Sequence, residues 1–363
     1  MADRLTDTAL YSSGTQGTFP DQGARPAVSH GPLGVDVGTC RIAVSRKVGD
    51  EVVTTRQLNA FFSVPYLTFT QEVLEKNRVN YFVDEDSLVI IGDAAERFSV
   101  VMNSAIRRPM CEGLLNPLEA KGQRVIQKIL ELLVGQPESL GESVCLNLPF
   151  VPDNWGHRLI YHEAILRSFF ISMGYRVKTV NEGLAVVLSE LGDTNFSGIG
   201  VSLGGGMCNG CLSYLSLPIL NFSIAKGGDY IDDSVAAVMN MLPTEVRLIK
   251  ENELDLGRPP RNQVENALQI FYDQVCRAVL EELNRMLLKS NKLPQIRQAV
   301  PIVLAGGTVM PKGFLDRFER IFGDFSFPIP VSGVKLADDP LTAPVRGALI
   351  TAAAKQTSAH TTA

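Results

Sequence analysis

The sequence predicts a mixed α/β fold built from two similar lobes with a cleft between them. Short apolar strands alternate with amphipathic helices along most of the chain, which is typical of sheets covered by helices. The alternation starts twice, near Leu33 and again near Gly198, each time with strands that read as a meander. Each half also places a glycine-rich turn directly after an apolar strand. We therefore expect an internal duplication whose glycine turns face each other across the cleft.

In the first half, strands are predicted where apolar runs end at Gly, Pro, Asn or Asp, and helices where apolar residues recur at helical spacing. The stripe of the second helix includes Leu118, and that of the third includes Ile160 and Ala164, which we expect in the core. The predicted strands are 33–37, 41–47, 51–57, 63–70, two within 81–91, 143–148 and 175–180, and the helices begin at 92–97 and span 117–134, 154–173 and 184–191.

The second half repeats this order by the same criteria. Its longest helix has an expected inner stripe that includes Val264, Ile270 and Val279. The predicted strands are 198–203, 211–217, 220–226, 300–304 and 331–336, and the helices are 226–241, 262–289, 312–322 and 343–354.

Composition narrows the class of protein. The chain has 363 residues, 45% hydrophobic and 20% charged, which is enough for two domains with their own cores. A net charge of −5 gives no reason to expect nucleic acid or an anionic membrane as the main partner. No apolar run approaches the roughly 20 residues of a membrane helix, and the start lacks the apolar core of a signal peptide. The scattered cysteines indicate a reduced, cytoplasmic protein, and the pair Cys208 and Cys211 has no second ligand pair for a metal.

The first glycine turn lies in Leu33–Val44, where Asp36 ends one strand and Gly38 and Thr39 form the bend. Such a hairpin can present backbone N–H groups and a hydroxyl to a phosphate, with an acid nearby for hydrated Mg²⁺. The motif is short, and an ordinary hairpin remains the alternative. Two further glycine turns, Ser202–Gly206 and Ala305–Thr308, also follow apolar runs and favour the phosphate interpretation.

In this arrangement the chain resembles the actin, hexokinase and heat-shock-chaperone ATPase superfamily, and within it the bacterial actins such as MreB and MamK. GVDVGTC resembles the first phosphate loop, VSLGGGMC the second, and VLAGGTVMPKGF the adenosine loop. NEGLAVV resembles the connecting helix with its catalytic acid, and KGGDYIDDSV the glycine turn and helix after the second meander. The resemblance covers about residues 31–354. It implies a two-lobed actin-like fold with duplicated ribonuclease-H-like domains around a nucleotide cleft.

The resemblance also implies a domain plan. A flexible tail is expected at residues 1–30 and another at 355–363, both polar and without periodicity. The expected first lobe is 31–182 with a small insertion subdomain at about 64–106, and the second is 183–354 with a small subdomain at about 242–262. The family usually has a sheet-bearing subdomain in the last of these places, and here it is reduced to a loop or short helix.

Site residues follow from the same resemblance, with ATP or ADP and Mg²⁺ as the implied ligands. Asp36 would hold the metal through water, and Glu182 would position the attacking water. Glu182 can also be read as an ordinary helix-start acid, and Lys250 and Glu251 as a solvated helix face. The implied nucleotide-binding residues are Gly38, Thr39, Cys40, Ser202, Gly204, Gly205, Gly206, Gly228, Lys250, Glu251, Gly306, Gly307, Thr308 and Met310.

The second phosphate loop departs from the family pattern, which begins with Asp and carries two threonines. Ser202 stands in place of the acid, and Met207 and Cys208 in place of the threonines. Loss of a positioned acid typically costs orders of magnitude in rate, while binding can persist through backbone N–H groups and Asp36. Slow or impaired hydrolysis is therefore expected.

Three functions are compatible with these features. The first is a cytoskeletal protein that binds ATP and self-associates head to tail into filaments, with adaptor or cargo proteins as further partners. The second is a nucleotide-binding scaffold of a division or secretion machinery that does not polymerise. The third is a small-molecule kinase, for which no substrate pocket stands out. The terminal segments are not amphipathic helices, so a direct membrane anchor is not expected.

Overall fold

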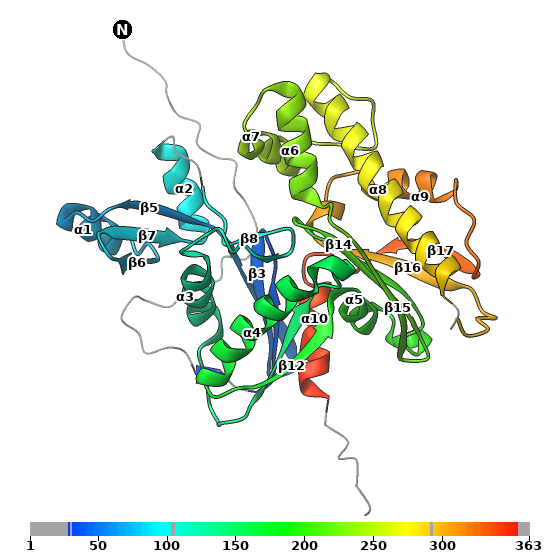
Figure 1. Cartoon of the computed structure of the whole chain (residues 1–363), viewed down its shortest axis with the longest axis horizontal. Coiled ribbons are helices and arrows are strands. Elements are labelled where there is room, and N and C mark those ends of the chain that lie inside the picture. The colour runs from blue at the N-terminus through cyan, green and yellow to red at the C-terminus, as the bar shows by residue number, and fades with distance from the viewer. Residues whose placement is uncertain (1–27, 30, 103–105, 291–292, 355–363) are drawn as a thin grey trace, which may run out of the picture.

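The computed structural model describes residues 28–29, 31–102, 106–290 and 293–354. Two five-stranded sheets lie side by side, with helices between and around them (Figure 1). In the described part of the chain, no helix is both long and apolar enough to cross a membrane. The tail predicted at 355–363 and nearly all of that at 1–30 lie outside the described residues.

The first sheet has the strand order β12-β11-β2-β3-β4. Its strands β2, β3 and β4 form an antiparallel meander, and β11 and β12 continue the sheet in parallel to β2. Leu33 and Val35 of β2 are fully buried beneath the surrounding helices. The bounds are β2 Leu33–Val37, β3 Arg41–Val48, β4 Glu51–Leu58, β11 Ser143–Leu148 and β12 Arg176–Asn181.

The second sheet repeats this topology, with the order β15-β14-β13-β16-β17. Again the first three strands form an antiparallel meander, and the last two are parallel to the first. The predicted duplication of a ribonuclease-H-like fold is therefore confirmed. The bounds are β13 Gly198–Leu203, β14 Cys208–Tyr214, β15 Leu217–Ile224, β16 Val300–Ala305 and β17 Val331–Leu336.

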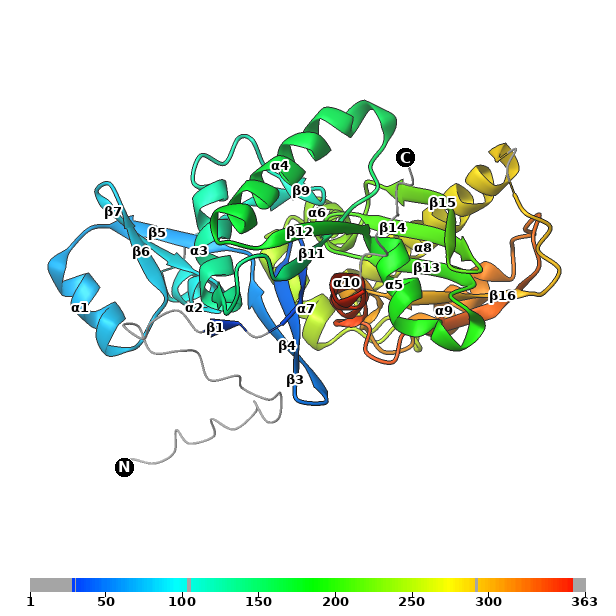
Figure 2. The ribbon, with the colours of Figure 1, turned by 90° about the horizontal axis from the view of Figure 1, so that it is seen from below.

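Two connecting helices, α5 (Glu182–Glu190) and α10 (Ala343–Ala353), lie between the sheets (Figures 1 and 2). Small residues make this packing possible. A Cβ atom on Gly34 of β2 would overlap the α10 backbone, and one on Gly200 of β13 would overlap the Gly183 carbonyl of α5. A Cβ atom on Gly347 would likewise overlap the Ala185 carbonyl, so the two helices touch along their backbones.

The remaining helices cover the outer faces of the sheets. The first lobe carries α3 (Gly122–Val134) and α4 (Gly156–Ser172). The second lobe carries α6 (Gly228–Met239), α7 (Pro243–Asn252), α8 (Gln263–Lys289) and α9 (Phe314–Phe322). Short elements are β1 Val28–Ser29 paired with β10 Gln136–Pro137, β8 Met110–Cys111 paired with β9 Leu114–Leu115, and the 3₁₀ turns Asp153–Trp155, Gly192–Thr194 and Gly307–Val309.

Each lobe also has a smaller part. The first contains a three-stranded antiparallel sheet with its own core, built from β5 Phe61–Pro65, β6 Tyr81–Asp84, β7 Ser87–Ile91, α1 Thr68–Lys76 and α2 Asp93–Val101. In the second, residues 242–262 are all described and contain α7 and an isolated bridge at Asp255 but no sheet. Arg247 of α7 forms a salt bridge with Glu96 of α2, so the two smaller parts meet across the cleft.

Several sequence predictions need correction. The strand predicted at 63–70 ends at Pro65, and α1 follows, with Leu74 as its buried residue, too few for a recognisable stripe. Helix α3 begins at Gly122, and Leu118 is 92% exposed in the turn before it. Ile160, predicted in the core, is 71% exposed because α4 is apolar on both faces and buries His162, Leu166, Phe169 and Phe170 instead. Ala164 of α4 and Ile270 of α8, which were also predicted in the core, are exposed as well.

Candidate functional site

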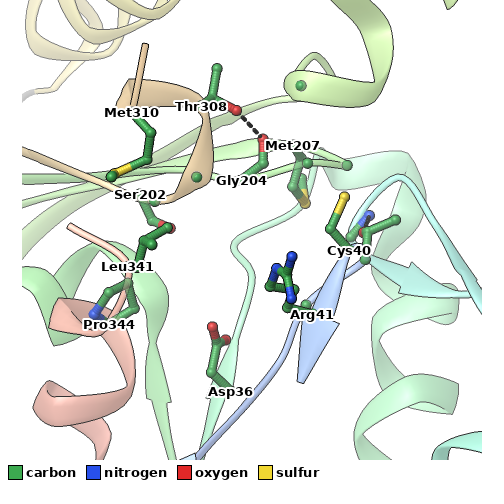
Figure 3. Close-up of a pocket in the computed structure, with 18 of the residues that line it drawn as sticks. Asp36, Cys40, Arg41, Ser202, Gly204, Met207, Thr308, Met310, Leu341 and Pro344 are labelled. Atoms are coloured by element: carbon green, nitrogen blue, oxygen red, sulfur yellow. Dashed lines mark hydrogen bonds between the residues drawn. The ribbon is translucent and has the colours of Figure 1, made fainter. Parts of the chain in front are cut away.

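A cavity of about 340 Å³ lies between the two lobes and is bordered by both meander turns and by the starts of α5, α6 and α10 (Figure 3). Every site residue expected from the sequence lines it. These are Asp36, Gly38, Thr39, Cys40, Glu182, Ser202, Gly204, Gly205, Gly206, Gly228, Lys250, Glu251, Gly306, Gly307, Thr308 and Met310. Segments far apart in the sequence therefore converge on one space.

Two carboxylates border this cavity. Asp36 lies near the end of β2, and Glu182 is the first residue of α5, where the Asn181 side chain caps the helix by accepting from Gly183 N at 2.9 Å. Glu182 is thus a helix-start acid as well as a cavity residue. Burial raises the pKa of Asp36, and burial together with the charge of Asp36 raises the pKa of Glu182 to about 8. A proton can therefore be retained by this pair near neutral pH.

Asn209 holds the Glu182 carboxylate in place, and the sequence analysis missed it. Its Nδ2 donates to Glu182 Oε2 at 3.1 Å, while its Oδ1 accepts from Phe150 N at 2.8 Å. Asn209 lies directly opposite Ser202 in the β13–β14 pair. The glycine turn between these strands fixes that pairing, so the register of the hairpin was the sequence signal that could have identified Asn209.

The two glycine turns meet across the cavity, as the duplication predicted. Thr39 Oγ1 accepts from Gly113 N at 3.0 Å, and a Cβ atom on Gly206 would overlap that same hydroxyl. A Cβ atom on Gly205 would lie against the Cys40 sulfur. Glycine is needed here because the turns leave no room for side chains between them.

A partly buried polar network joins the lobes beside these turns. Arg108 Nη1 lies 2.7 Å from Cys40 Sγ and 3.5 Å from Asp229 Oδ1 at the start of α6. Cys40 Sγ itself lies 3.4 Å from Asp229 Oδ1. Burial raises the pKa of the Cys40 thiol, so the thiol form is favoured.

Lys250 is buried, so the alternative of a solvated helix face is wrong for this residue. Its ammonium donates to Asp232 Oδ2 at 2.7 Å and to Gly228 O at 3.0 Å. Lys250 therefore braces the start of α6 within a buried ion pair. Glu251, the next residue, is exposed at the cavity edge.

The third glycine turn follows β16. Gly306 has a φ of +98°, and a Cβ atom there would overlap the Leu203 backbone, so the position requires glycine. Thr308 Oγ1 donates to Gly204 O at 2.8 Å, which ties this turn to the second one (Figure 3). Met310 lies half exposed at the rim.

A family model, Volactin, matches residues 32–352 of the sequence. The chain belongs to the volactin family. Comparison of the sequence with curated proteins finds no significant match.

Among solved structures, the chain is similar to the MamK double helical filament, with a TM-score of 0.65 and 18% identity over 90% of this chain and 100% of that chain. It is similar to MreB 5 of Spiroplasma citri bound to AMPPNP, with a TM-score of 0.62 and 16% identity over 89% of this chain and 96% of that one. It is also similar to the ethanolamine utilization protein EutJ from Carboxydothermus hydrogenoformans, with a TM-score of 0.50 and 16% identity over 87% of this chain and 88% of that chain. These likenesses confirm an actin-like fold.

The cavity is also lined by residues that the sequence analysis did not predict. Two are cationic, Arg41 of β3 and Arg56 of β4. The others are Ala43, Gly113, Met207, Tyr272, Pro311, Leu341 and Pro344. Most of them come from strands or helix starts that reach the cavity through the tertiary fold, where no local motif marks them.

Proposed function

We propose that this protein is an actin-like cytoskeletal protein that binds ATP between its lobes and polymerises head to tail into filaments, with slow hydrolysis. The convergence of three glycine turns and two half-buried carboxylates on one cavity carries the proposal. Nucleotides in similar structures support it: one MreB 5 structure is bound to AMPPNP and another to ADP. The MamK filament supports self-association.

The cavity fits a hydrated Mg²⁺, which takes one or two carboxylates and phosphate oxygens and keeps several waters. Asp36 supplies the carboxylate. The buried Asn147 amide lies beside it and lowers its pKa, while neither amide atom has a hydrogen-bond partner in the described part of the chain. Bound Mg²⁺ would supply positive charge against the phosphates. The described residues hold no cluster of three or more metal-ligating side chains, which is consistent with a metal held mainly through the nucleotide and water.

The chain's own residues divide the remaining work. Backbone N–H groups of the glycine turns bind phosphate oxygens, and Gly306, Gly307 and Met310 border the nucleoside. Glu182, oriented by Asn209, accepts a proton from the attacking water when it is ionised. Its raised pKa makes the carboxylate a stronger base, although the nucleotide-free protein keeps it mostly protonated near neutral pH. Ser202 offers no charge at the position of the family's second acid, and this limits the rate.

The hydrolysis part is tested with Ser202→Asp and its neutral, similarly sized control Ser202→Asn. If the missing acid is limiting, Asp at this position raises phosphate release from saturating Mg-ATP by about tenfold or more, and Asn does not. Equal rates for both variants would place the limitation elsewhere.

The binding and assembly parts are tested by negative-stain microscopy and sedimentation of the full chain with Mg-ATP, with Mg-ADP and without nucleotide. Filaments that form with ATP and disappear in Asp36→Ala support a nucleotide-gated polymer. Filaments in every condition would show assembly uncoupled from the cavity. Absence of polymer at all concentrations, with nucleotide still bound, would favour the scaffold function.

A further inference from the structure

A row of three residues crosses the first sheet at the edge of the cavity. Asp36 of β2 lies opposite Ala43 of β3, and Ala43 lies opposite Arg56 of β4. Residues directly opposite one another in a sheet point to the same face, and neighbouring strands are about 4.8 Å apart. Ala43 is small and buried, so the long Arg56 side chain can extend over it toward Asp36.

Arg41 lies on the same face, two residues before Ala43 on β3. Figure 3 shows it on the wall that carries Asp36 and Cys40, across the cavity from Ser202 and Leu341. Its nearest acid is Asp93 at 3.6 Å, and both side chains of this pair are about half exposed. An exposed pair at this distance contributes little, so Arg41 is available to a stronger anionic partner.

The charges that line the cavity leave these two arginines uncommitted. The third cation, Lys250, is held by buried Asp232. The Arg56 guanidinium is exposed and has no hydrogen-bond or salt-bridge partner among the residues that the structure describes. Ser202, moreover, adds no negative charge to the opposite wall.

We propose that Arg41 and Arg56 bind the phosphate chain of the nucleotide and supply part of the charge compensation otherwise given by a divalent cation. The inference rests on the proposed nucleotide site and deepens it. The guanidinium fork matches phosphate oxygens in a bidentate fashion, and it stays charged at every relevant pH. Nucleotide binding by this protein is therefore only weakly dependent on Mg²⁺.

The test is isothermal titration calorimetry of the full chain with ADP, ATP and adenosine, once in Mg²⁺ and once in EDTA. The variants are Arg41→Gln, Arg56→Gln and the double substitution. Lys47→Gln is the matched control, because Lys47 is an exposed cation on the same strand β3, away from the cavity. Arg56→Lys tests whether charge alone suffices.

For the unmodified protein, we expect the Kd of ADP to rise by about tenfold or less when Mg²⁺ is replaced by EDTA. In the double variant we expect a further rise of about tenfold or more in EDTA, because the loss of even one charge-assisted hydrogen bond has about that effect. Adenosine lacks phosphates, so its affinity should stay the same in all variants, which also shows that the fold is intact.

Two results would overturn the inference. If the double variant and Lys47→Gln bind ADP equally well in EDTA, the arginines do not contact the phosphates. If the unmodified protein binds ADP tightly in Mg²⁺ but loses it fully in EDTA, the metal is indispensable and the arginines do not replace it. In both cases nucleotide binding itself stands, whereas failure to bind any nucleotide under either condition would remove the proposed function together with this inference.

Discussion

Ser202 and Asp36 occupy equivalent places in the two halves of the molecule. Each lies two residues after a glycine that packs beneath a connecting helix, Gly34 under α10 and Gly200 under α5. Each also faces a residue of the neighbouring antiparallel strand, Ala43 or Asn209. The duplicated frame thus carries a carboxylate on one side and a hydroxyl on the other. This difference contributes to the electrostatic asymmetry of the site, together with Glu182 and with Arg41 and Arg56 on the wall of Asp36.

Glu182 should make the stability of the nucleotide-free protein depend on pH. Its pKa rises from 4.5 to about 8 on folding, so between these values the folded protein keeps a proton that the unfolded chain releases. The stabilising contribution of Glu182 is therefore fully present below pH 4.5 and is lost as the pH rises toward 8. We expect Glu182→Gln to lose less stability between pH 5 and pH 8 than the unmodified protein, measured by denaturant midpoints.

Two comparisons control this experiment. Glu131→Gln, on the exposed face of α3, should keep the slope of the unmodified protein. Buried Asp232, whose pKa is raised to about 6, leaves a residual slope below that pH in every variant. A Glu182→Gln variant with an unchanged slope would show that Glu182 is ionised in the folded protein.

At the residue scale, the sequence predicts those site residues that belong to short motifs. Glycine turns and the acids beside them are fixed by local backbone geometry, so their convergence followed once the duplication was recognised. Asn209, Arg41 and Arg56 could not be found in this way. Arg41 and Arg56 reach the cavity, and Asn209 reaches Glu182, because of strand register and the size of the neighbouring Ala43, which are properties of the assembled sheet.

Among the elements, helices α5 and α10 show how strongly small residues determine the packing. Gly347 faces the Ala185 carbonyl so closely that a methyl group has no space. Alanine normally favours a helix interior by about 1 kcal/mol over glycine. Here the steric overlap is with backbone, which cannot rotate away, and the overlap therefore outweighs the helix preference.

Gly347→Ala is expected to destabilise the protein by about 1–3 kcal/mol, the range for overpacking a well-filled core. Thermal unfolding of the nucleotide-free chain measures it. Gly156→Ala is the matched control, since it is also helical and a Cβ atom there meets nothing within 4 Å. A neutral or stabilising effect of Gly347→Ala would mean that the two helices separate without cost.

The elements themselves were predicted well where apolar runs end at turn residues or recur at helical spacing. Strands β2 and β3 and helix α8 agree closely with their predicted positions. The strands predicted at 211–217 and 220–226 are wrong in position, because β14 and β15 each begin three residues earlier and the first prediction runs through the turn between them. Helix α1 was missed because it buries little more than Leu74, and the buried face of α4 was misplaced because Ile160 on its outer face is as apolar as the core. Periodicity cannot distinguish two apolar faces.

For the molecule as a whole, the contact between Arg247 and Glu96 links the two smaller parts. Arg247 is buried and Glu96 is about one-third exposed. Loss of one partner leaves a buried charge without compensation, at a cost between that of surface and buried pairs. The contact spans the opening between α2 and α7, so it opposes separation of the lobes there (Figure 1).

Glu96→Gln should therefore speed the release of bound nucleotide, by about threefold to tenfold for a partly exposed pair. Stopped-flow displacement of a fluorescent ADP analogue gives the rate. Glu72→Gln, an exposed acid on α1 in the same subdomain, serves as the control and should release nucleotide at the unmodified rate. Identical rates for both variants would exclude a role of this contact in retention.

The close contact between α5 and α10 has a mechanical consequence. Because α5 and α10 touch along their backbones at Gly347 and Ala185, we expect these helices to rotate about this contact and not to slide along each other. The lobes would then rotate as two rigid bodies about this hinge, and a small rotation there becomes a larger displacement where Arg247 meets Glu96. A pair of distance probes on α2 and α7 would thus report rotations that are too small to detect at the hinge itself.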